Sequence, residues 1–350
     1  MSIEKILVIR FRRVGDAVLS GVLCSSLRKS FPHAQIDYVL NEGIAPLYSG
    51  HPDVDNVISF SNHDNANIFR YTNKVWRLMK GEHYDVILDT RSTILTLIFS
   101  LFSLSTPYRI GIRKYYNYFL HNHRVDNRKD IKADVIDRLL LLLKPLEQEA
   151  KIVYVKEFRL SITGQEKQSF RMYMEQQGID FSKPVILAAV TARLSHKVWD
   201  KEKMKAVLQK MIDRYQSQII FNYAGNEKEY AEELHQEMGF DPHVFLHIQA
   251  DSLRELGAMT ANCDFFFGNE GGPRHISQAL EIPSYAIFPP GVSKSVWLPA
   301  GDQGRYQGIS PDDVLPLEEQ YRMTYSERFN LISIECVWSQ VDQMMRHYLR

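Results

Sequence analysis

The sequence predicts two α/β domains, each built on a parallel β-sheet with helices on both faces. Three observations favour this fold class. The chain has 350 residues, which suggests two domains because domains average about 150 residues. Continuous apolar runs of strand length alternate with helical patterns, as in parallel sheets that are buried on both faces. This alternation pauses around residues 144–163 and then begins again.

The first half opens with the apolar run ILVI at residues 6–9, which has the length of a strand. A short polar turn follows at residues 12–16, and then apolar residues recur at helical spacing up to Pro32. Proline has no backbone N–H, so it ends that helix. The expected elements are a helix at 17–31, strands at 36–40 and 57–60, a helix at 74–80, a strand at 86–88 and a helix at 93–104.

The second half repeats the alternation from a strand at 185–190. The expected elements that follow are helices at 201–215, 228–238, 253–262 and 274–280, and strands at 218–223, 265–267 and 284–288. Residues 301–333 look irregular, and residues 335–349 predict a closing helix. We therefore expect an N-terminal domain at 1–160, a C-terminal domain at 161–334 and a closing helix within 335–350.

Charge separates the two halves, although the whole chain has no net charge. Residues 1–160 hold 23 Lys/Arg and 17 Asp/Glu, a net charge of +6, and residues 161–350 hold the other 19 and 25, a net charge of −6. This split suggests that the first half meets an anionic partner, and ordinary surface variation explains it equally well. A nucleic-acid partner is not expected, because the chain is neutral and contains no known nucleic-acid-binding module.

The cysteines and the apolar runs limit the class of protein. Cys24, Cys263 and Cys336 form no CxxC pair, which excludes a disulfide scaffold or a zinc ribbon and fits a reducing compartment. The N-terminal apolar run is too short for a signal peptide. The longest apolar run covers residues 94–104, whereas a membrane-spanning helix needs about 20 residues. A buried helix is the favoured interpretation, with a membrane-touching helix as the alternative.

Polar residues after the first strand form the first candidate site. Gly15 permits a tight turn, and Asp16 follows it where the helix begins. Ligands of open α/β sheets bind beyond the carboxyl ends of the strands, so this turn is well placed for chemistry. A helix cap is the simpler explanation of Asp16, because aspartate is a favoured N-cap residue. The turn does not match the GxGxxG dinucleotide pattern.

Three further loops after strands form a candidate anion site in the second half. Residues 268–275 (GNEGGPRH) place adjacent glycines before a helix, where free N–H groups and the helix dipole favour a diphosphate over a plain turn. Lys197 or Arg193, in the loop after the strand at 185–190, could neutralise phosphate charge. Glu227 could hold ribose hydroxyls, although glutamate is also common in the first turn of helices.

Two patterns that resemble metal sites are not expected to bind metal. Asp53-Val54-Asp55 has DxD spacing, but it precedes its strand and so lies at the wrong end. His121 and His123 could chelate a metal, but the sequence offers no third ligand nearby. The chain also contains no P-loop, HExxH or GxSxG motif. We therefore predict neither a metal nor another cofactor.

Taken in order, these segments resemble the ADP-heptose:lipopolysaccharide heptosyltransferases of glycosyltransferase family 9. The resemblance covers nearly the whole chain. It rests on the opening strand with its Gly-Asp turn and helix, on HPDVDNVISF, HYDVILDTRS and YRIGIR, on HKVWDKEKM with its Lys-x-Trp segment, on YAGNEKEYAEEL, and on GNEGGPRHISQALEIP. Each piece alone is weak, but the set is specific.

The resemblance implies a GT-B fold, in which two Rossmann-like domains face each other across a cleft, and inverting sugar transfer without a required metal. The N-terminal domain would bind a lipopolysaccharide acceptor, and the C-terminal domain an ADP-sugar. It further implies a cytoplasmic protein that can contact the inner membrane peripherally. By position, Asp16 corresponds to the family's general base. The donor residues would be Thr191, Lys197, Glu227, Glu270, Gly271, Gly272 and His275.

An anionic acceptor would be met by arginines of the first half, because arginine pairs bidentately with phosphates and carboxylates. The candidates are Arg12, Arg13, Arg91, Arg109 and Arg113. The sequence departs from the family at Glu270 and Gly271, where Asp followed by Ser or Thr is usual, and at Arg274, where the family often has a small or apolar residue. Two alternatives therefore stay open: a family 9 enzyme with another nucleotide sugar or glycan acceptor, and a catalytically impaired sugar-nucleotide-binding protein.

Overall fold

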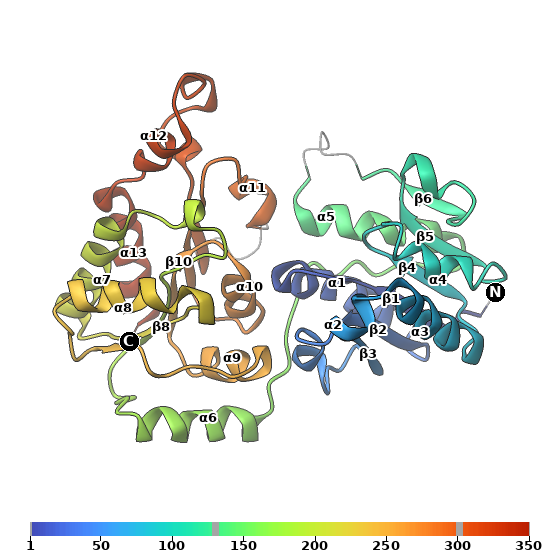
Figure 1. The fold of residues 1–350 in the computed structure, drawn as a ribbon, viewed down its shortest axis with the longest axis horizontal. Helices are drawn as coiled ribbons and strands as arrows, with labels where there is room; N and C mark the ends of the chain where they lie inside the picture. The colour runs from blue at the N-terminus through green and yellow to red at the C-terminus, as the bar shows by residue number, and fades with distance from the viewer. Residues whose placement is uncertain (1, 128–132, 299–303, 350) are drawn as a thin grey trace. The chain divides into compact units, whose positions relative to one another are not determined.

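The structure is a computed structural model that describes residues 2–127, 133–298 and 304–349. The chain divides into two compact units, Met1–Ser161 and Ile162–Arg350. Each unit contains one six-stranded sheet in which every paired strand runs parallel to its neighbour (Figure 1). The predicted fold class of two parallel α/β domains is therefore confirmed.

Unit 1 has the strand order β3-β2-β1-β4-β5-β6. Its strands are β1 (Lys5–Ile9), β2 (Gln35–Asn41), β3 (Asn56–Phe60), β4 (Val86–Asp89), β5 (Tyr108–Ile112) and β6 (His123–Val125). Its helices are α1 (Val14–Ser30), α2 (Asn62–Asn65), α3 (Ile68–Gly81), α4 (Leu97–Leu101) and α5 (Val135–Leu140). Strand β1 lies in the middle of the sheet and is almost entirely buried, which explains its continuous apolar sequence.

Unit 2 has the strand order β12-β11-β10-β7-β8-β9. Its strands are β7 (Val185–Ala189), β8 (Gln218–Phe221), β9 (Val244–Phe245), β10 (Phe265–Asn269), β11 (Ser284–Ile287) and β12 (Tyr306–Ile309). Its helices are α6 (Gly164–Gln176), α7 (Lys201–Tyr215), α8 (Lys228–Glu237), α9 (Leu253–Thr260), α10 (Gly272–Ala279), α11 (Lys294–Trp297), α12 (Tyr325–Asn330) and α13 (Ile334–Tyr348).

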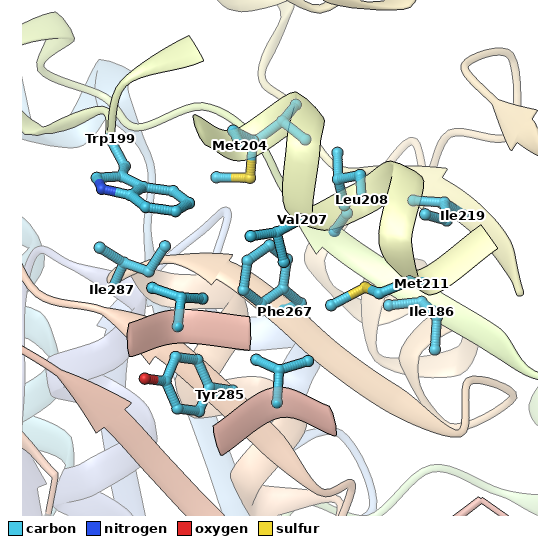
Figure 2. Packing of buried hydrophobic residues seen from close by; sticks show 14 of the residues in the cluster. Ile186, Trp199, Met204, Val207, Leu208, Met211, Ile219, Phe267, Tyr285 and Ile287 are labelled. Carbon is cyan, nitrogen blue, oxygen red and sulfur yellow. The ribbon is translucent and has the colours of Figure 1, made fainter. Parts of the chain in front are cut away.

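Each unit has its own hydrophobic core. In unit 2, side chains from helix α7 and from Trp199 pack onto Phe267 of β10 and Tyr285 of β11 (Figure 2). In unit 1, Phe11, Phe60, Tyr71 and Phe99 form a buried aromatic cluster whose ring centroids lie 5.3–6.4 Å apart. These cores anchor the strand ends that carry the polar loops.

Two predicted segments differ from the structure. The helix expected at 93–104 is reduced to α4. Its buried apolar residues are Leu97 and Phe99, whereas Ile94, Leu95 and Leu104 on either side of it are exposed. The expectation of an irregular segment at 301–333 was wrong, because residues 304–333 contain strand β12 and helix α12. Residues 301–303 lie outside the described residues. Within the described ranges, no helix combines the length and apolarity that a membrane crossing requires.

Candidate functional site

The turn between β1 and α1 places Asp16 in the first turn of the helix rather than at its cap. Helix α1 begins at Val14, and its N-cap residue Arg13 makes no side-chain capping bond. The Asp16 carboxylate instead pairs with Arg10, with 2.9 Å between Oδ2 and Nη2. The capping explanation of Asp16 was therefore wrong, and its carboxylate lies beyond the carboxyl end of β1.

Arg10 is a site residue that the sequence analysis missed. It follows the last residue of β1, and its guanidinium also donates to the carbonyl and hydroxyl oxygens of Thr90 at 3.4 and 3.5 Å. It therefore connects the ends of the neighbouring strands β1 and β4 while it holds Asp16. Its position directly after a buried strand was the signal available in the sequence.

Arg91 joins this cluster from the end of β4. Its guanidinium donates to the Phe11 carbonyl at 3.4 Å. Burial lowers the pKa of Arg91, and the nearby charges of Arg10 and Arg12 lower it further. Arg12 and Arg13 are exposed beside it, so this edge of the sheet gathers positive charge around one carboxylate. An anionic ligand would relieve the repulsion among these arginines.

A buried polar cluster supports the loop that carries Arg91. The Oδ1 atom of Asp89 accepts hydrogen bonds from the backbone N–H groups of Arg91 and Ser92, at 2.9 and 2.8 Å. Its Oδ2 atom lies 3.6 Å from Nε2 of His121. Because the Asn117 amide nitrogen donates to Nδ1 of His121 at 3.0 Å, the proton of the neutral ring lies on Nε2. Burial lowers the pKa of His121, which favours this neutral form.

The other two candidate acceptor residues, Arg109 and Arg113, differ in exposure. Arg113 follows β5 and is exposed. Arg109 lies near the start of β5, and its guanidinium donates to the carbonyls of Leu104, Thr106 and Leu120 at 2.6–2.8 Å. It is nine-tenths buried. Arg109 therefore joins segments of unit 1, and we remove it from the acceptor set.

In unit 2, β10 and the loop after β7 are held together at their carboxyl ends. The Asn269 side chain donates to the carbonyls of Ala189 and Val190 and accepts from the Trp199 N–H at 2.8 Å. Gly268 has φ +137°, and a Cβ there would lie 2.3 Å from the Ala189 carbonyl oxygen. Only glycine fits this position. The sequence analysis included both residues in the segment 268–275 but gave neither a role of its own.

The N-terminus of α10 is open to an anion. Gly271 is its N-cap residue, no side chain caps the helix and its first turn contains no acid. First-turn N–H groups have no partner within the helix, and the helix dipole adds partial positive charge there. Lys197 lies close enough to lower the pKa of the neighbouring Glu270. Lys197, Gly271 and Gly272 all belong to unit 2, and their joint role in binding a diphosphate stays a prediction.

Glu270 is surrounded by positive and polar groups. Burial would raise the pKa of Glu270, but His275, Arg274 and Lys197 outweigh that effect and lower it. The Nε2 atom of His275 lies 3.6 Å from Oε1 of Glu270. Arg274 is completely buried, and burial lowers its pKa to about 10. A buried arginine is an unusual feature, and its charge balances that of the glutamate.

Glu227 and Thr191 form a second polar pair in the same unit. The Thr191 hydroxyl donates to Oε2 of Glu227 at 2.6 Å, and the Ala224 N–H donates to the same oxygen at 2.9 Å. Both residues follow carboxyl ends of adjacent strands, β7 and β8. Both of these hydrogen bonds go to Oε2, so within the part of the chain that the structure describes Oε1 of Glu227 remains suited to a sugar hydroxyl.

The two metal-like patterns are occupied by local contacts. Asp53 accepts from the Ser25 hydroxyl, and Asp55 pairs with Arg28, both at 2.5 Å and both before β3 as expected. His123 stacks on Tyr108, whereas His121 faces Asp89. Among residues 2–127, 133–298 and 304–349, no three His, Cys, Asp or Glu side chains are grouped as a metal site would require.

Comparison with solved structures identifies the fold class. The structure of a family 9 glycosyl transferase from Veillonella parvula has a TM-score of 0.83 at 16% identity and covers 99% of this chain and 98% of its own. The Escherichia coli ADP-heptose lps heptosyltransferase II has a TM-score of 0.77 at 19% identity, with 98% and 99% covered. The fold is that of the GT-B glycosyltransferases.

The sequence comparisons identify the family. The model for glycosyltransferase family 9 (heptosyltransferase) matches residues 72–303. The chain belongs to this family and is a glycosyltransferase. One relative, the lipopolysaccharide heptosyltransferase 1 of Campylobacter coli, is 25% identical over 293 residues, which are 81% of this chain and 83% of the relative. The predicted family is therefore confirmed.

Proposed function

We propose that this glycosyltransferase transfers heptose from ADP-heptose to the core of lipopolysaccharide, with inversion at the sugar carbon. The names of the relatives support this donor and acceptor. The observation that carries the proposal is the N-terminus of α10, which no side chain caps and which therefore suits a diphosphate. The positive charge of Lys197, which lowers the pKa of the adjacent Glu270, supports it. Unit 2 would bind the donor, and unit 1 the acceptor.

Asp16 would act as the general base. The acceptor hydroxyl oxygen attacks the anomeric carbon of the donor, its proton passes to the Asp16 carboxylate, and the bond from that carbon to the diphosphate oxygen breaks. A carboxylate within hydrogen-bond reach of the nucleophile suits this step. The 2.9 Å pair with Arg10 would orient the Asp16 carboxylate toward the acceptor.

The negative charge that develops on the departing ADP would be stabilised by fixed groups of unit 2. These would be Lys197 and the N–H groups at Gly271 and Gly272, which need no rearrangement during the reaction if the folded unit 2 holds them in place. Thr191 and Glu227 would hold the ribose. Glu270 and His275 would border the diphosphate, with the charge of Glu270 compensated by Arg274.

The acceptor would meet the cationic edge of unit 1. Arg12, Arg13, Arg91 and Arg113 are the proposed contacts, and Arg10 is added because it lies against Asp16. Phosphates or acidic sugars of a lipopolysaccharide core are suitable partners for such a group of guanidiniums.

The alternative of an impaired sugar-nucleotide-binding protein rests on Glu270 and Gly271. Two observations favour an active site instead. The charge of Glu270 has a buried counter-charge in Arg274, and Gly271 leaves space at the helix N-terminus because a Cβ there would approach nothing closer than 3.8 Å. Donor turnover with acceptor present distinguishes the two alternatives.

Calorimetry with a panel of nucleotide sugars tests the donor. ADP-heptose should bind more tightly than UDP- or GDP-sugars, and a preference for another nucleotide would contradict the proposed donor. Lys197→Ala should weaken ADP binding about 10–100-fold and adenosine binding little, because only ADP carries the diphosphate. Lys183→Ala, a change of an exposed residue just before β7, is the matched control. An equal loss for both ligands would refute the phosphate role.

A further inference from the structure

The carboxyl end of β4 carries a buried ionisable pair, Asp89 and His121, that the proposed reaction does not use. Both side chains are fully buried, and Oδ2 of Asp89 lies 3.6 Å from Nε2 of His121. Taking a carboxylate out of water is costly unless other groups compensate its charge. Buried ionisable groups of this kind gather at functional sites, so we examined what the pair holds in place.

The loop after β5 fixes the imidazole ring of His121. The Asn117 amide nitrogen donates to the Ile112 carbonyl at 2.8 Å and to Nδ1 of His121 at 3.0 Å. Gly111 leaves space for the ring, because a Cβ there would lie 2.2 Å from it. The ring is therefore held with its Nε2 atom beside Asp89.

Asp89 in turn fixes the tight turn that follows β4. Its Oδ1 atom accepts from the backbone N–H groups of Arg91 and Ser92 at 2.9 and 2.8 Å. Ser92 has φ +51°, a left-handed conformation that a residue with a side chain keeps only where its surroundings hold it. The Ser92 hydroxyl accepts from the Ile112 N–H, and its carbonyl accepts from the Tyr116 hydroxyl, both at 2.8 Å.

The same turn contacts the residues beside the proposed base. The Thr90 hydroxyl donates to the Ile9 carbonyl at 2.8 Å. The Arg10 guanidinium donates to the carbonyl and hydroxyl oxygens of Thr90 at 3.4 and 3.5 Å, and it pairs with Asp16 at 2.9 Å. A continuous series of contacts within unit 1 thus leads from His121 to the Asp16 carboxylate.

We propose that Asp89 and His121 are positioning residues for the transfer reaction. They hold the turn after β4, the turn holds the Arg10 guanidinium through Thr90, and Arg10 orients the Asp16 carboxylate toward the acceptor hydroxyl. A displacement of about 1 Å at a reacting group can cost about 100-fold in rate, which explains why a buried pair would be kept for this purpose. The inference rests on the proposed function, because it takes Asp16 as the base.

Amide hydrogen exchange tests the first step on the full chain, without donor or acceptor. His121→Leu keeps the volume of the side chain but removes both ring nitrogens, so the Asp89 carboxylate loses a neighbour that fixes it. The amides of Arg91 and Ser92 should then exchange at least about tenfold faster, with exchange inside β1 unchanged. His121→Gln retains an N–H that can reach Asp89, and it should restore most of the protection.

Steady-state kinetics tests the second step. His121→Leu should lower kcat about 10–100-fold and change the acceptor KM less than about threefold, and His121→Gln should stay within about threefold of wild type. His51→Ala is the matched control, because His51 is also a buried histidine of unit 1, but its Nε2 contacts the Arg159 carbonyl at 3.0 Å before β3. It should keep its kcat.

A double-mutant cycle separates positioning from a general loss of stability. If the pair acts through Arg10, His121→Leu should cost less than about threefold in kcat when Arg10→Ala is already present, whereas a weakened fold would cost the same factor in both backgrounds. Thr90→Val breaks the same series of contacts at its next step, and it should lower kcat at least about threefold even if His121→Leu does not fold.

Unchanged amide exchange in a folded His121→Leu variant overturns the inference. So do equal kcat losses in His121→Leu, His121→Gln and His51→Ala, additive losses in the cycle, or a Thr90→Val variant with the wild-type kcat. A wild-type chain that fails to transfer heptose while its exchange results stand would refute the proposed function and leave the role of the pair in the turn intact, so the two failures are distinguishable.

Discussion

Replacing Asp16 with asparagine tests the proposed chemistry most directly. The side chain keeps its size and one hydrogen-bonding oxygen, but it cannot take a proton from a hydroxyl at neutral pH. It also loses the charge that pairs with Arg10 at 2.9 Å. The variant should therefore fold and should fail at the chemical step.

The expected loss of folding stability and the expected loss of kcat differ widely in size. A hydrogen bond between charged groups contributes about 1.5–3 kcal/mol, and asparagine keeps part of it, so a loss of about 1 kcal/mol is expected. In a unit of this size, that loss lowers the Tm by about 2–4 °C. Removal of a general base lowers kcat by about 10²–10⁴-fold. The catalytic loss is thus much larger than the stability loss.

The assay measures Tm, ADP-heptose affinity and single-turnover rate on one preparation. Asp55→Asn is the control, because Asp55 also pairs with an arginine, Arg28, but at the opposite edge of the sheet. It should lose a similar small amount of stability and keep its kcat. Donor affinity should be unchanged in both variants, since the proposed donor residues belong to unit 2.

A folded Asp16→Asn variant that turns over at nearly the wild-type rate would refute the assignment of Asp16 as the base. The same rate loss in Asp55→Asn would also refute it, because the effect would then follow from disturbing any ion pair of unit 1. A loss confined to KM would assign Asp16 to acceptor binding instead.

Three other expectations can be measured on the same protein. Turnover should persist in EDTA, and a loss that Mg²⁺ or Mn²⁺ restores would contradict a metal-independent reaction. Gly111→Ala should destabilise unit 1 by about 1–3 kcal/mol, since the added Cβ would lie 2.2 Å from the buried His121 ring. Gly43→Ala is its control and should unfold like wild type, because a Cβ at that position would meet no atom within 4 Å. The Arg254 guanidinium donates to the Glu166 carboxylate at 2.7–2.8 Å and lowers the pKa of Glu166 to about 2, so the carboxylate stabilises the fold above pH 4.5 and loses this effect as pH falls toward 2. The stability difference from Glu166→Gln should shrink over that range, and a constant difference would contradict the assignment.

The alternation of apolar strands with helices was sufficient to predict two parallel sheets, because buried parallel strands need continuous apolar sequence. The same reasoning placed Asp16, Lys197 and Gly271 in loops after strands, since the carboxyl ends of parallel strands share one edge. These predictions depend on local order along the chain. Sequence reasoning about local patterns is therefore strongest for the sheets and their βα loops.

Only the tertiary structure distinguished arginines that look alike in sequence. Arg10 faces Asp16, whereas Arg109 is enclosed by three carbonyls from segments up to 11 residues away. The apolar run at 94–104 divides in the same way, with Phe99 buried and Ile94 exposed. Which side of a short segment meets the core depends on how neighbouring helices pack, and packing is decided by contacts between residues far apart in the chain.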